Sequence, residues 1–156
     1  MKRTLTAVAV TASLIASGAF AFDPEDVQKL KKTNECMVCD LIGATLVKAE
    51  MNKAIMSASN LQRAYMSEAS LVGAYMVDAN LEGADLSGAN IAQARMSRAN
   101  LRGADLSNAF MMHTDLSGAD LSNANLEGAT MSGITMIGVI LCNTTMPDGS
   151  VVYSGC

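Results

Sequence analysis

The 156-residue sequence predicts an all-β solenoid, a coil of short strands with four sides per turn. The main observation is a period of five residues: from Leu41 to Met146 every fifth residue is Leu, Met or Ile, over 22 consecutive positions. Of the 22 positions that stand two residues before these, 16 are the small residue Ala. Aromatic residues make up only 4% of the chain and Trp is absent, which argues against an ordinary mixed core. Repetition at a fixed short period is the signature of a solenoid.

The five-residue period fits neither a continuous helix nor a continuous strand. On a helix five residues turn through about 500°, so successive apolar residues would drift around the axis. On a strand an odd step sends alternate residues to opposite faces. The apolar set shares one core only if the chain turns between units, which makes each unit one short side. Steps of 20 give the most uniform column and favour four sides per turn: Leu41, Leu61, Leu81, Leu101, Leu121 and Leu141.

The first 21 residues resemble a secretory signal peptide. Lys2 and Arg3 begin the chain, Leu5–Ile15 is an apolar run, and Ala19-Phe20-Ala21 is a small-x-small cleavage signature. The alternative is an uncleaved anchor, for which the apolar run is short. Cleavage would leave a chain starting at Phe22 with a net charge of −6 instead of −4 and no membrane span. We therefore expect a periplasmic or secreted protein, or a thylakoid-lumen protein in a photosynthetic source.

Residues 22–38 are predicted to form an N-terminal capping segment with a short helix. Asp23 is a good N-cap residue, and Pro24 suits the first turn of a helix. Val27 and Leu30 give this helix one apolar edge. An open β-coil exposes unpaired backbone groups, so we expect the apolar edge to lie over the first coil.

The repeat region is predicted to span residues 39–148, and residues 149–156 are predicted to form a C-terminal cap. Near the end of the repeat the small-residue rule weakens, since bulkier residues replace Ala. The sequence Pro147-Asp148-Gly149-Ser150 is typical of a turn. Val151–Tyr153 is predicted to follow as a short covering strand.

The repeating units resemble the pentapeptide-repeat family. They are illustrated by Ala79-Asn80-Leu81-Glu82-Gly83 and Ala84-Asp85-Leu86-Ser87-Gly88, and the resemblance covers residues 39–148 without interruption. The family implies a right-handed quadrilateral β-helix in which the central residue and the small residue two places before it point inward. With 22 units this would give about 5.5 coils and a length of about 26 Å at the usual spacing between strands.

The four cysteines lie in two pairs at opposite ends of the predicted solenoid. The estimated length separates the pairs too far for a shared disulfide or a four-cysteine zinc site. We therefore predict a disulfide between Cys142 and Cys156, which would clamp the C-terminal cap. For Cys36 and Cys39 a structural disulfide is the favoured interpretation, and a redox-active pair with thioredoxin-like spacing is the alternative.

Composition and motifs argue against an enzyme and predict no catalytic residue, cofactor or metal site. His113 is the only His and has no second candidate ligand, so it is interpreted as a surface residue. Nine of the 12 Met are central residues of repeat units, which indicates core filling by a flexible side chain. Asp and Asn before the central residues are interpreted as corner hydrogen-bonding groups rather than calcium ligands. The acidic net charge makes nucleic acid an unexpected partner.

One outward surface is the candidate site for an unknown protein partner. If the coil has four sides, one side presents a set of apolar residues and the only His, which together we call the apolar flank: Val72, Ala92, Phe110, Met112 and His113. The side centred on Leu46 instead carries a net charge of −3. We therefore predict an exported, non-catalytic module with a structural or protein-binding role. The alternative is an acidic DNA mimic resembling the gyrase-protecting members of the family, from which this sequence departs in its export signal, modest charge and lack of an inserted loop.

Overall fold

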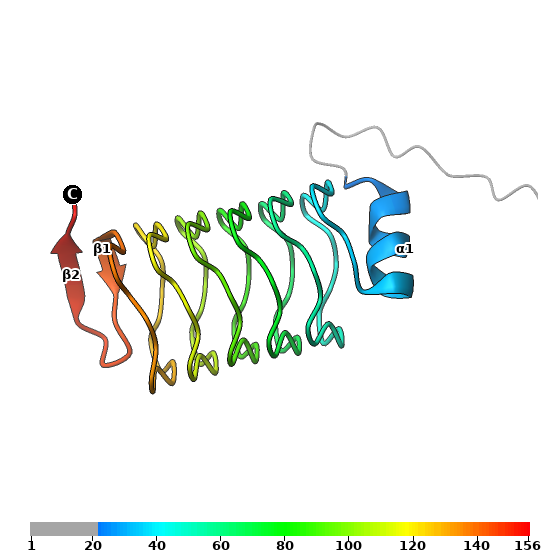
Figure 1. Cartoon of the computed structure of the whole chain (residues 1–156). Coiled ribbons are helices and arrows are strands. Elements are labelled where there is room, and N and C mark those ends of the chain that lie inside the picture. Colours follow the sequence, from blue (N-terminus) through cyan, green and yellow to red (C-terminus); the bar gives the residue numbers. More distant parts are fainter. Residues whose placement is uncertain (1–21) are drawn as a thin grey trace, which may run out of the picture.

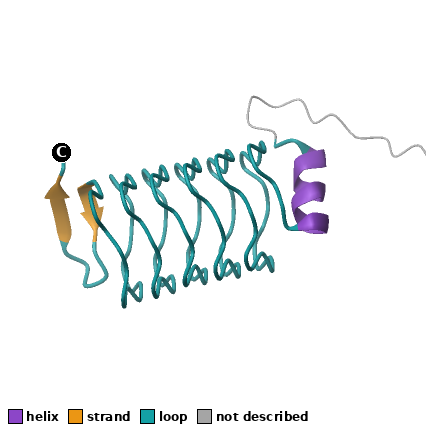
Figure 2. Cartoon of the chain, viewed as in Figure 1, coloured by secondary structure: helices purple, strands orange, loops and turns teal. Residues whose placement is uncertain are grey.

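The structure is a computed structural model that describes residues 22–156, and the predicted signal peptide, residues 1–21, lies outside the described residues. Its elements are one helix, α1 (Pro24–Thr33), and two strands, β1 (Leu141–Thr145) and β2 (Val151–Ser154). Between α1 and β1 the chain winds as a regular solenoid. The helix lies at one end of this solenoid and the two strands lie at the other (Figure 1). Figure 2 shows that the described coils between α1 and β1 consist of loops and turns, without a further helix or strand.

The solenoid has four five-residue sides per turn, which confirms the prediction from the 20-residue columns. Parallel bridges join residues 20 apart along the chain, from Glu35 with Ile55 to Asn125 with Thr145. At Leu61 the backbone N–H donates to the carbonyl of Asn80 at 2.7 Å. Every coil therefore hydrogen-bonds to the next, and the result is the quadrilateral β-helix that the family resemblance implies.

A β-turn closes each five-residue side between residues 36 and 140. In the first complete unit the N–H of Ala44 donates to the carbonyl of Leu41 at 3.0 Å. The third residue of this turn, Gly43, has a φ of 66°, which a side chain disfavours and glycine adopts freely. Other residues occupy the same place in many units, and Val38 stands there with a φ of 57° although it is β-branched.

The core is a narrow tube of Leu, Met, Ile and Ala. Central residues such as Leu81 and small residues such as Ala79 are buried, as the sequence predicts. Where a polar residue replaces Ala in the inward small position, its hydroxyl binds a carbonyl: Thr114 Oγ1 donates to Ile91 at 2.8 Å. No buried side-chain nitrogen or oxygen within residues 22–156 lacks a hydrogen bond. The tube is therefore both apolar and fully satisfied in its polar groups.

At the N-terminal end α1 closes the tube, as the sequence predicts. The Asp23 side chain caps the helix by accepting from the N–H of Glu25 at 2.8 Å. Val27 and Leu30 are buried against the core. The parallel bridges between coils begin at Glu35, before the repeat region predicted from residue 39. Cys36 beside it occupies a buried central position, five residues before Leu41.

At the C-terminal end β2 pairs antiparallel with β1, so that Leu141 lies opposite Ser154 and Thr145 opposite Val151. The tube is less closed here. Inward residues of the last coil pack against the core but stay partly exposed: Met131, Ile134, Met136, Val139, Leu141 and Met146. A strand that extends one side of the coil leaves the other sides uncovered.

Both cysteine pairs are disulfides in the structure. Cys36 joins Cys39 with a Cα–Cα distance of 5.4 Å, and Cys142 joins Cys156 with a distance of 4.8 Å. The first disulfide lies inside the tube beneath α1, where both cysteines are buried. The second ties the chain after β2 back to the last coil. Within residues 22–156 no helix is long and apolar enough to cross a bilayer.

Candidate functional site

The apolar flank occupies one side of the solenoid at adjacent coils. Phe110 and Met112 stand on either side of the buried Met111, so they point outward and are 53% and 43% exposed. Val72 and Ala92 precede Met112 at steps of 20, but they are half-buried. The exposed apolar part of the flank is therefore narrower than the sequence predicts and is centred on Phe110 and Met112.

Backbone hydrogen bonds on both strand edges hold this part of the flank in place. The N–H of Phe110 donates to the carbonyl of Ala89 at 2.9 Å, and the carbonyl of Met112 accepts from Gln93 at 2.8 Å. The N–H of Met111 donates onward to Thr130 at 2.9 Å. Neighbouring coils on both sides thus fix the two exposed side chains on a rigid backbone.

His113 completes the flank at a turn, where its φ is 57°. Its ring lies over the next coil, because a Cβ added to Gly133 would come within 2.4 Å of His113 Nδ1. The glycine at position 133 thus makes room for the imidazole as well as adopting a φ of 67°. The structure therefore places His113 beside Phe110 and Met112 as a packed surface group, in keeping with the sequence interpretation.

One cluster in the described part of the chain has the composition of a metal site. Ligand atoms of Asp26, Cys36 and Cys39 lie within 4.8 Å of one another. Both sulfur atoms belong to the disulfide, however, and Asp26 Oδ2 accepts a hydrogen bond from the N–H of Asp40 at 2.8 Å. Metal ions bind thiolates, and a disulfide sulfur is not a thiolate. This cluster therefore links α1 to the first coil and is not a metal site.

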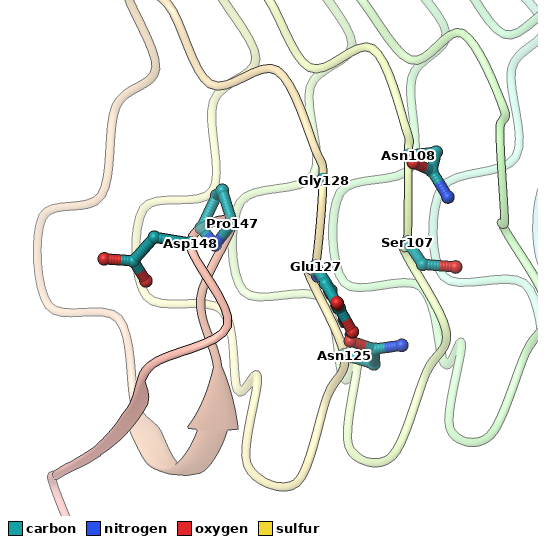
Figure 3. Close-up of a pocket in the computed structure, with 7 residues that line it drawn as sticks. All are labelled: Ser107, Asn108, Asn125, Glu127, Gly128, Pro147 and Asp148. Atoms are coloured by element: carbon teal, nitrogen blue, oxygen red, sulfur yellow. Dashed lines mark hydrogen bonds between the residues drawn. The ribbon is translucent and has the colours of Figure 1, made fainter.

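A shallow polar hollow of about 550 Å³ lies near the C-terminal end. It is on the side of the coil centred on Leu46, which we call the acidic side because its net charge is −3. Figure 3 shows that its side chains do not converge, since the Asp148 carboxylate points away from Glu127. Asp148 Oδ1 accepts from the hydroxyl of Ser150 at 2.6 Å and from its N–H at 3.0 Å. These hydrogen bonds, the hydroxyl first, hold the pKa of Asp148 below its usual range. This carboxylate therefore stabilises a turn.

The same corner chemistry recurs along the solenoid, as the sequence interpretation of Asp and Asn predicts. At Asp115 the carboxylate accepts from the Ser117 hydroxyl at 2.6 Å and from the Ser117 N–H at 3.0 Å, and both bonds lower its pKa. Asn side chains also stack between coils, so that Asn100 Nδ2 donates to Asn80 Oδ1 at 3.0 Å. On the acidic side Lys48 pairs with Glu68 at 3.2 Å, an exposed ion pair of small energetic value.

Sequence reasoning missed a second exposed apolar region at the C-terminal end. Ile137 is 76% exposed and Tyr153 is 67% exposed, and both lie beside the partly buried residues of the last coil. A signal was present in the sequence, since residues 130–156 contain one charged side chain, Asp148.

Comparison with known proteins places the chain in a family. The family model of pentapeptide repeats, which holds eight copies, matches residues 38–73, 59–98 and 94–133. No curated protein matches the sequence.

Among solved structures, HetL from the cyanobacterium Nostoc, a pentapeptide repeat protein involved in heterocyst differentiation regulation, is 30% identical over 76% of this chain and 64% of its own, with a TM-score of 0.36. Rfr23 from the cyanobacterium Cyanothece is 24% identical over 83% of this chain and 98% of its own, with a TM-score of 0.48. A pentapeptide repeat protein of the Arabidopsis thaliana thylakoid lumen is 23% identical over 80% of this chain and 73% of its own, with a TM-score of 0.33. The family model covers more than half of the sequence, and the chain therefore belongs to the pentapeptide-repeat family.

Proposed function

We propose that this protein is an exported, non-catalytic binding module and that the apolar flank is its docking surface for another protein. The observation that carries the proposal is the exposure of Phe110 and Met112 side by side on a surface otherwise rich in Asp, Asn and Ser. Large exposed apolar side chains that adjoin one another mark interaction sites more often than single scattered ones. Aromatic residues and Met are also enriched at the centres of protein interfaces.

The rigidity of the solenoid supports this role. Phe110 and Met112 are held by coils on both sides, so binding would cost little ordering of the backbone. Within the flank, Phe110 and Met112 are the two large apolar side chains that are exposed. A partner would meet an apolar centre with a polar rim, the usual anatomy of a protein interface.

Export is supported by two features that are independent of each other. Residues 1–21 have the sequence of a signal peptide, and the body of the protein contains two disulfides. Disulfides persist in oxidising compartments and are rare in the cytosol. Cell fractionation tests the location, and mass spectrometry of the purified protein tests cleavage before Phe22. A protein that stays with the nucleoid would contradict export and favour the DNA-mimic alternative.

The docking surface is tested by affinity capture with paired baits. The wild-type protein and a Phe110→Ser, Met112→Ser double variant are used to capture proteins from the exported fraction of the source cells. A Tyr65→Ser variant is the matched control, since Tyr65 is similarly exposed but belongs to a different side of the coil. We expect a partner that is retained by wild type and control and lost with the double variant. Identical sets of captured proteins from all three baits would remove the apolar flank from consideration.

A further inference from the structure

The side of the coil centred on Met56 carries an apolar surface in the coils next to α1. We call this surface the Val38 face, and it consists of Met37, Val38, Ile55, Tyr75 and Val77. Met37, Val38 and Tyr75 are 59%, 75% and 41% exposed. Ile55 and Val77 are half-buried, and a parallel bridge joins Ile55 to Tyr75 in the next coil. Adjoining exposed apolar side chains of this kind can mark an interaction site.

Val38 is held in a conformation that its own side chain disfavours. Its φ is 57°, and among residues 22–156 it is the one β-branched residue with a positive φ. The side chain is largely exposed, so packing within the chain does little to offset the strain. Backbone strain that the surrounding structure maintains is concentrated at functional sites. The fold thus presents a branched apolar side chain to solvent at a cost in stability, which favours a role in binding.

The backbone beneath the Val38 face is rigid. The disulfide between Cys36 and Cys39 closes the turn that carries Val38. The N–H of Val38 donates to the carbonyl of Ser57 at 3.1 Å, and the N–H of Cys36 donates to the carbonyl of Ile55 at 2.7 Å. A partner would therefore find this surface already in place and would lose little free energy in ordering it.

Two cations stand at the edge of the face beside Tyr75. The guanidinium carbon of Arg95 lies 5.6 Å from the centre of the Tyr75 ring, and Lys53 lies at the turn that leads into this side. Neither cation forms an ion pair within residues 22–156. At the other edge of the same side, by contrast, Arg98 is already paired with Asp78 at 2.7 Å.

The acidic groups on this side leave the two cations available. Asp115 follows Arg95 in the same column, but its carboxylate accepts from the hydroxyl of Ser117 at 2.6 Å. Glu35 stands at the α1 end of that column, three coils before Arg95. The acidic side lies opposite in the four-sided coil, so it adds least repulsion here. A carboxylate of a partner that contacts Tyr75 would therefore meet complementary charge.

We propose that the Val38 face binds a segment of another protein that carries apolar side chains next to a carboxylate. The apolar side chains pack on Met37, Val38 and Tyr75, and the carboxylate pairs with Lys53 and Arg95. The Val38 face shares no residue with the apolar flank and lies on a different side of the coil. The two surfaces are therefore independent, and either can fail its test without the other.

Peptide selection tests the chemistry of this partner. A phage-displayed library of random peptides is panned against the purified, oxidised protein, and the most enriched peptide is synthesised with a fluorescent label. We expect the enriched peptides to combine large apolar residues with Asp or Glu. Fluorescence anisotropy then measures the dissociation constant, which should rise with salt concentration because the contacts with Lys53 and Arg95 are screened.

Val38→Gly separates binding from folding. It removes the strained side chain, so the variant should fold and unfold at a higher temperature than wild type, yet it should bind the peptide about 10-fold more weakly. Tyr75→Ser should weaken binding by a similar factor, and Arg95→Gln should reduce the dependence on salt. Asn143→Gly is the matched control, because Asn143 occupies an equivalent turn at the other end with a φ of 56°. It should leave binding unchanged.

The proposal is overturned if no selected peptide is weakened by Val38→Gly, or if the enriched peptides lack acidic residues. Loss of the peptide in the Phe110→Ser, Met112→Ser double variant, with full binding by Val38→Gly, would assign the peptide to the apolar flank and overturn it too. Two other occupants are tested with the same variant. Binding to vesicles of phosphatidylcholine and phosphatidylglycerol, or a doubled mass in sedimentation equilibrium, that Val38→Gly abolishes would assign the face to a lipid surface or a second copy and overturn the proposal.

Discussion

The two ends of the solenoid are closed in different ways and to different degrees. At the N-terminal end α1 lies across the coil, and its buried Val27 and Leu30 cover the tube (Figure 1). At the C-terminal end β2 extends a single side, and the inward residues of the last coil remain partly exposed. An amphipathic helix presents a wide apolar face, whereas a strand covers only the side with which it pairs. The difference explains why inward residues of the last coil, such as Met131 and Met136, are more exposed than the inward Leu41 of the first coil.

The largest expected effect compares one leucine at each end. Leu30→Ala removes a buried side chain that seals the first coil and should reduce the free energy of unfolding by about 3 kcal/mol. Leu141→Ala removes a partly exposed side chain from the last coil and should cost about 1 kcal/mol in the monomer. Urea unfolding followed by circular dichroism measures both.

These measurements are made at a low protein concentration, so that association does not contribute to the free energy of unfolding. Equal losses for Leu30→Ala and Leu141→Ala under those conditions would show that the two ends are closed equally well. That outcome would contradict the comparison.

The second prediction concerns the disulfide that anchors the C-terminal end. Because β2 buries few side chains, the Cys142–Cys156 disulfide is expected to hold it against β1. The double variant Cys142→Ala, Cys156→Ala opens a loop with a sequence separation of 14 residues and should lower the free energy of unfolding by up to about 3 kcal/mol on the chain-entropy model.

Hydrogen exchange gives the sharper measurement of that variant. The amides of β2 should exchange much faster, while amides of the central coils, such as Leu81, keep their protection. Protection of β2 that survives loss of the disulfide would show that side-chain packing alone holds this strand.

Much of the fold was predictable from the sequence because a single rule repeats. The five-residue period, the small inward residues and the uniform 20-residue columns together predict a four-sided coil, and the bridges confirm it. At Cys36 a cysteine stands where the later units have Leu, Met or Ile, five residues before Leu41. A cysteine in that place reads as a disulfide partner, and only the structure shows that it also fills the core.

The candidate site was less predictable, because exposure depends on neighbouring coils and not on residue type. Val72 and Met112 occupy the same column, yet the first is half-buried and the second is exposed. Likewise Met111 and Met131 both occupy central positions, and only the second lacks a covering coil. Patterns assign a side chain to the inner or outer surface. They do not tell how completely the next turn of the chain will cover it.

The third prediction compares equivalent turn positions at the two ends. Val38 and Asn143 both have a positive φ, of 57° and 56°, but Val is β-branched and tolerates this conformation poorly, whereas Asn adopts it readily. Val38→Gly should therefore stabilise the protein by about 1 kcal/mol. Asn143→Gly should change stability little or reduce it slightly, because it removes a hydrogen bond of 2.9 Å to Asn123. Thermal unfolding ranks the two variants, and a stabilisation by Asn143→Gly as large as that by Val38→Gly would contradict this account of the turns.

The smallest expected effect concerns pH and compares a turn of the body with the turn before β2. Asp115 and Asp148 accept the same pair of hydrogen bonds, from Ser117 and Ser150, and the pKa of each is lowered. A carboxyl group whose pKa is lower in the folded state stabilises the protein above the usual carboxyl range, and this contribution disappears as the pH falls through the lowered pKa. Stability should therefore be flat from about pH 7 to 5 and decline below about pH 4.

Ser117→Ala and Ser150→Ala remove the hydroxyl donors, so each should raise the pKa of its own aspartate towards the usual value. Carbon-13 NMR titration of the two carboxyl groups measures the shifts one residue at a time. Because Asp115 lies in the hydrogen-bonded body, protonating it should also lower the free energy of global unfolding. Protonating Asp148 should loosen only the turn before β2. If Asp148 proves to be coupled to global unfolding as strongly as Asp115, the C-terminal end is as much a part of the cooperative body as the coils before it. The distinction between the two ends would then concern burial alone and not stability.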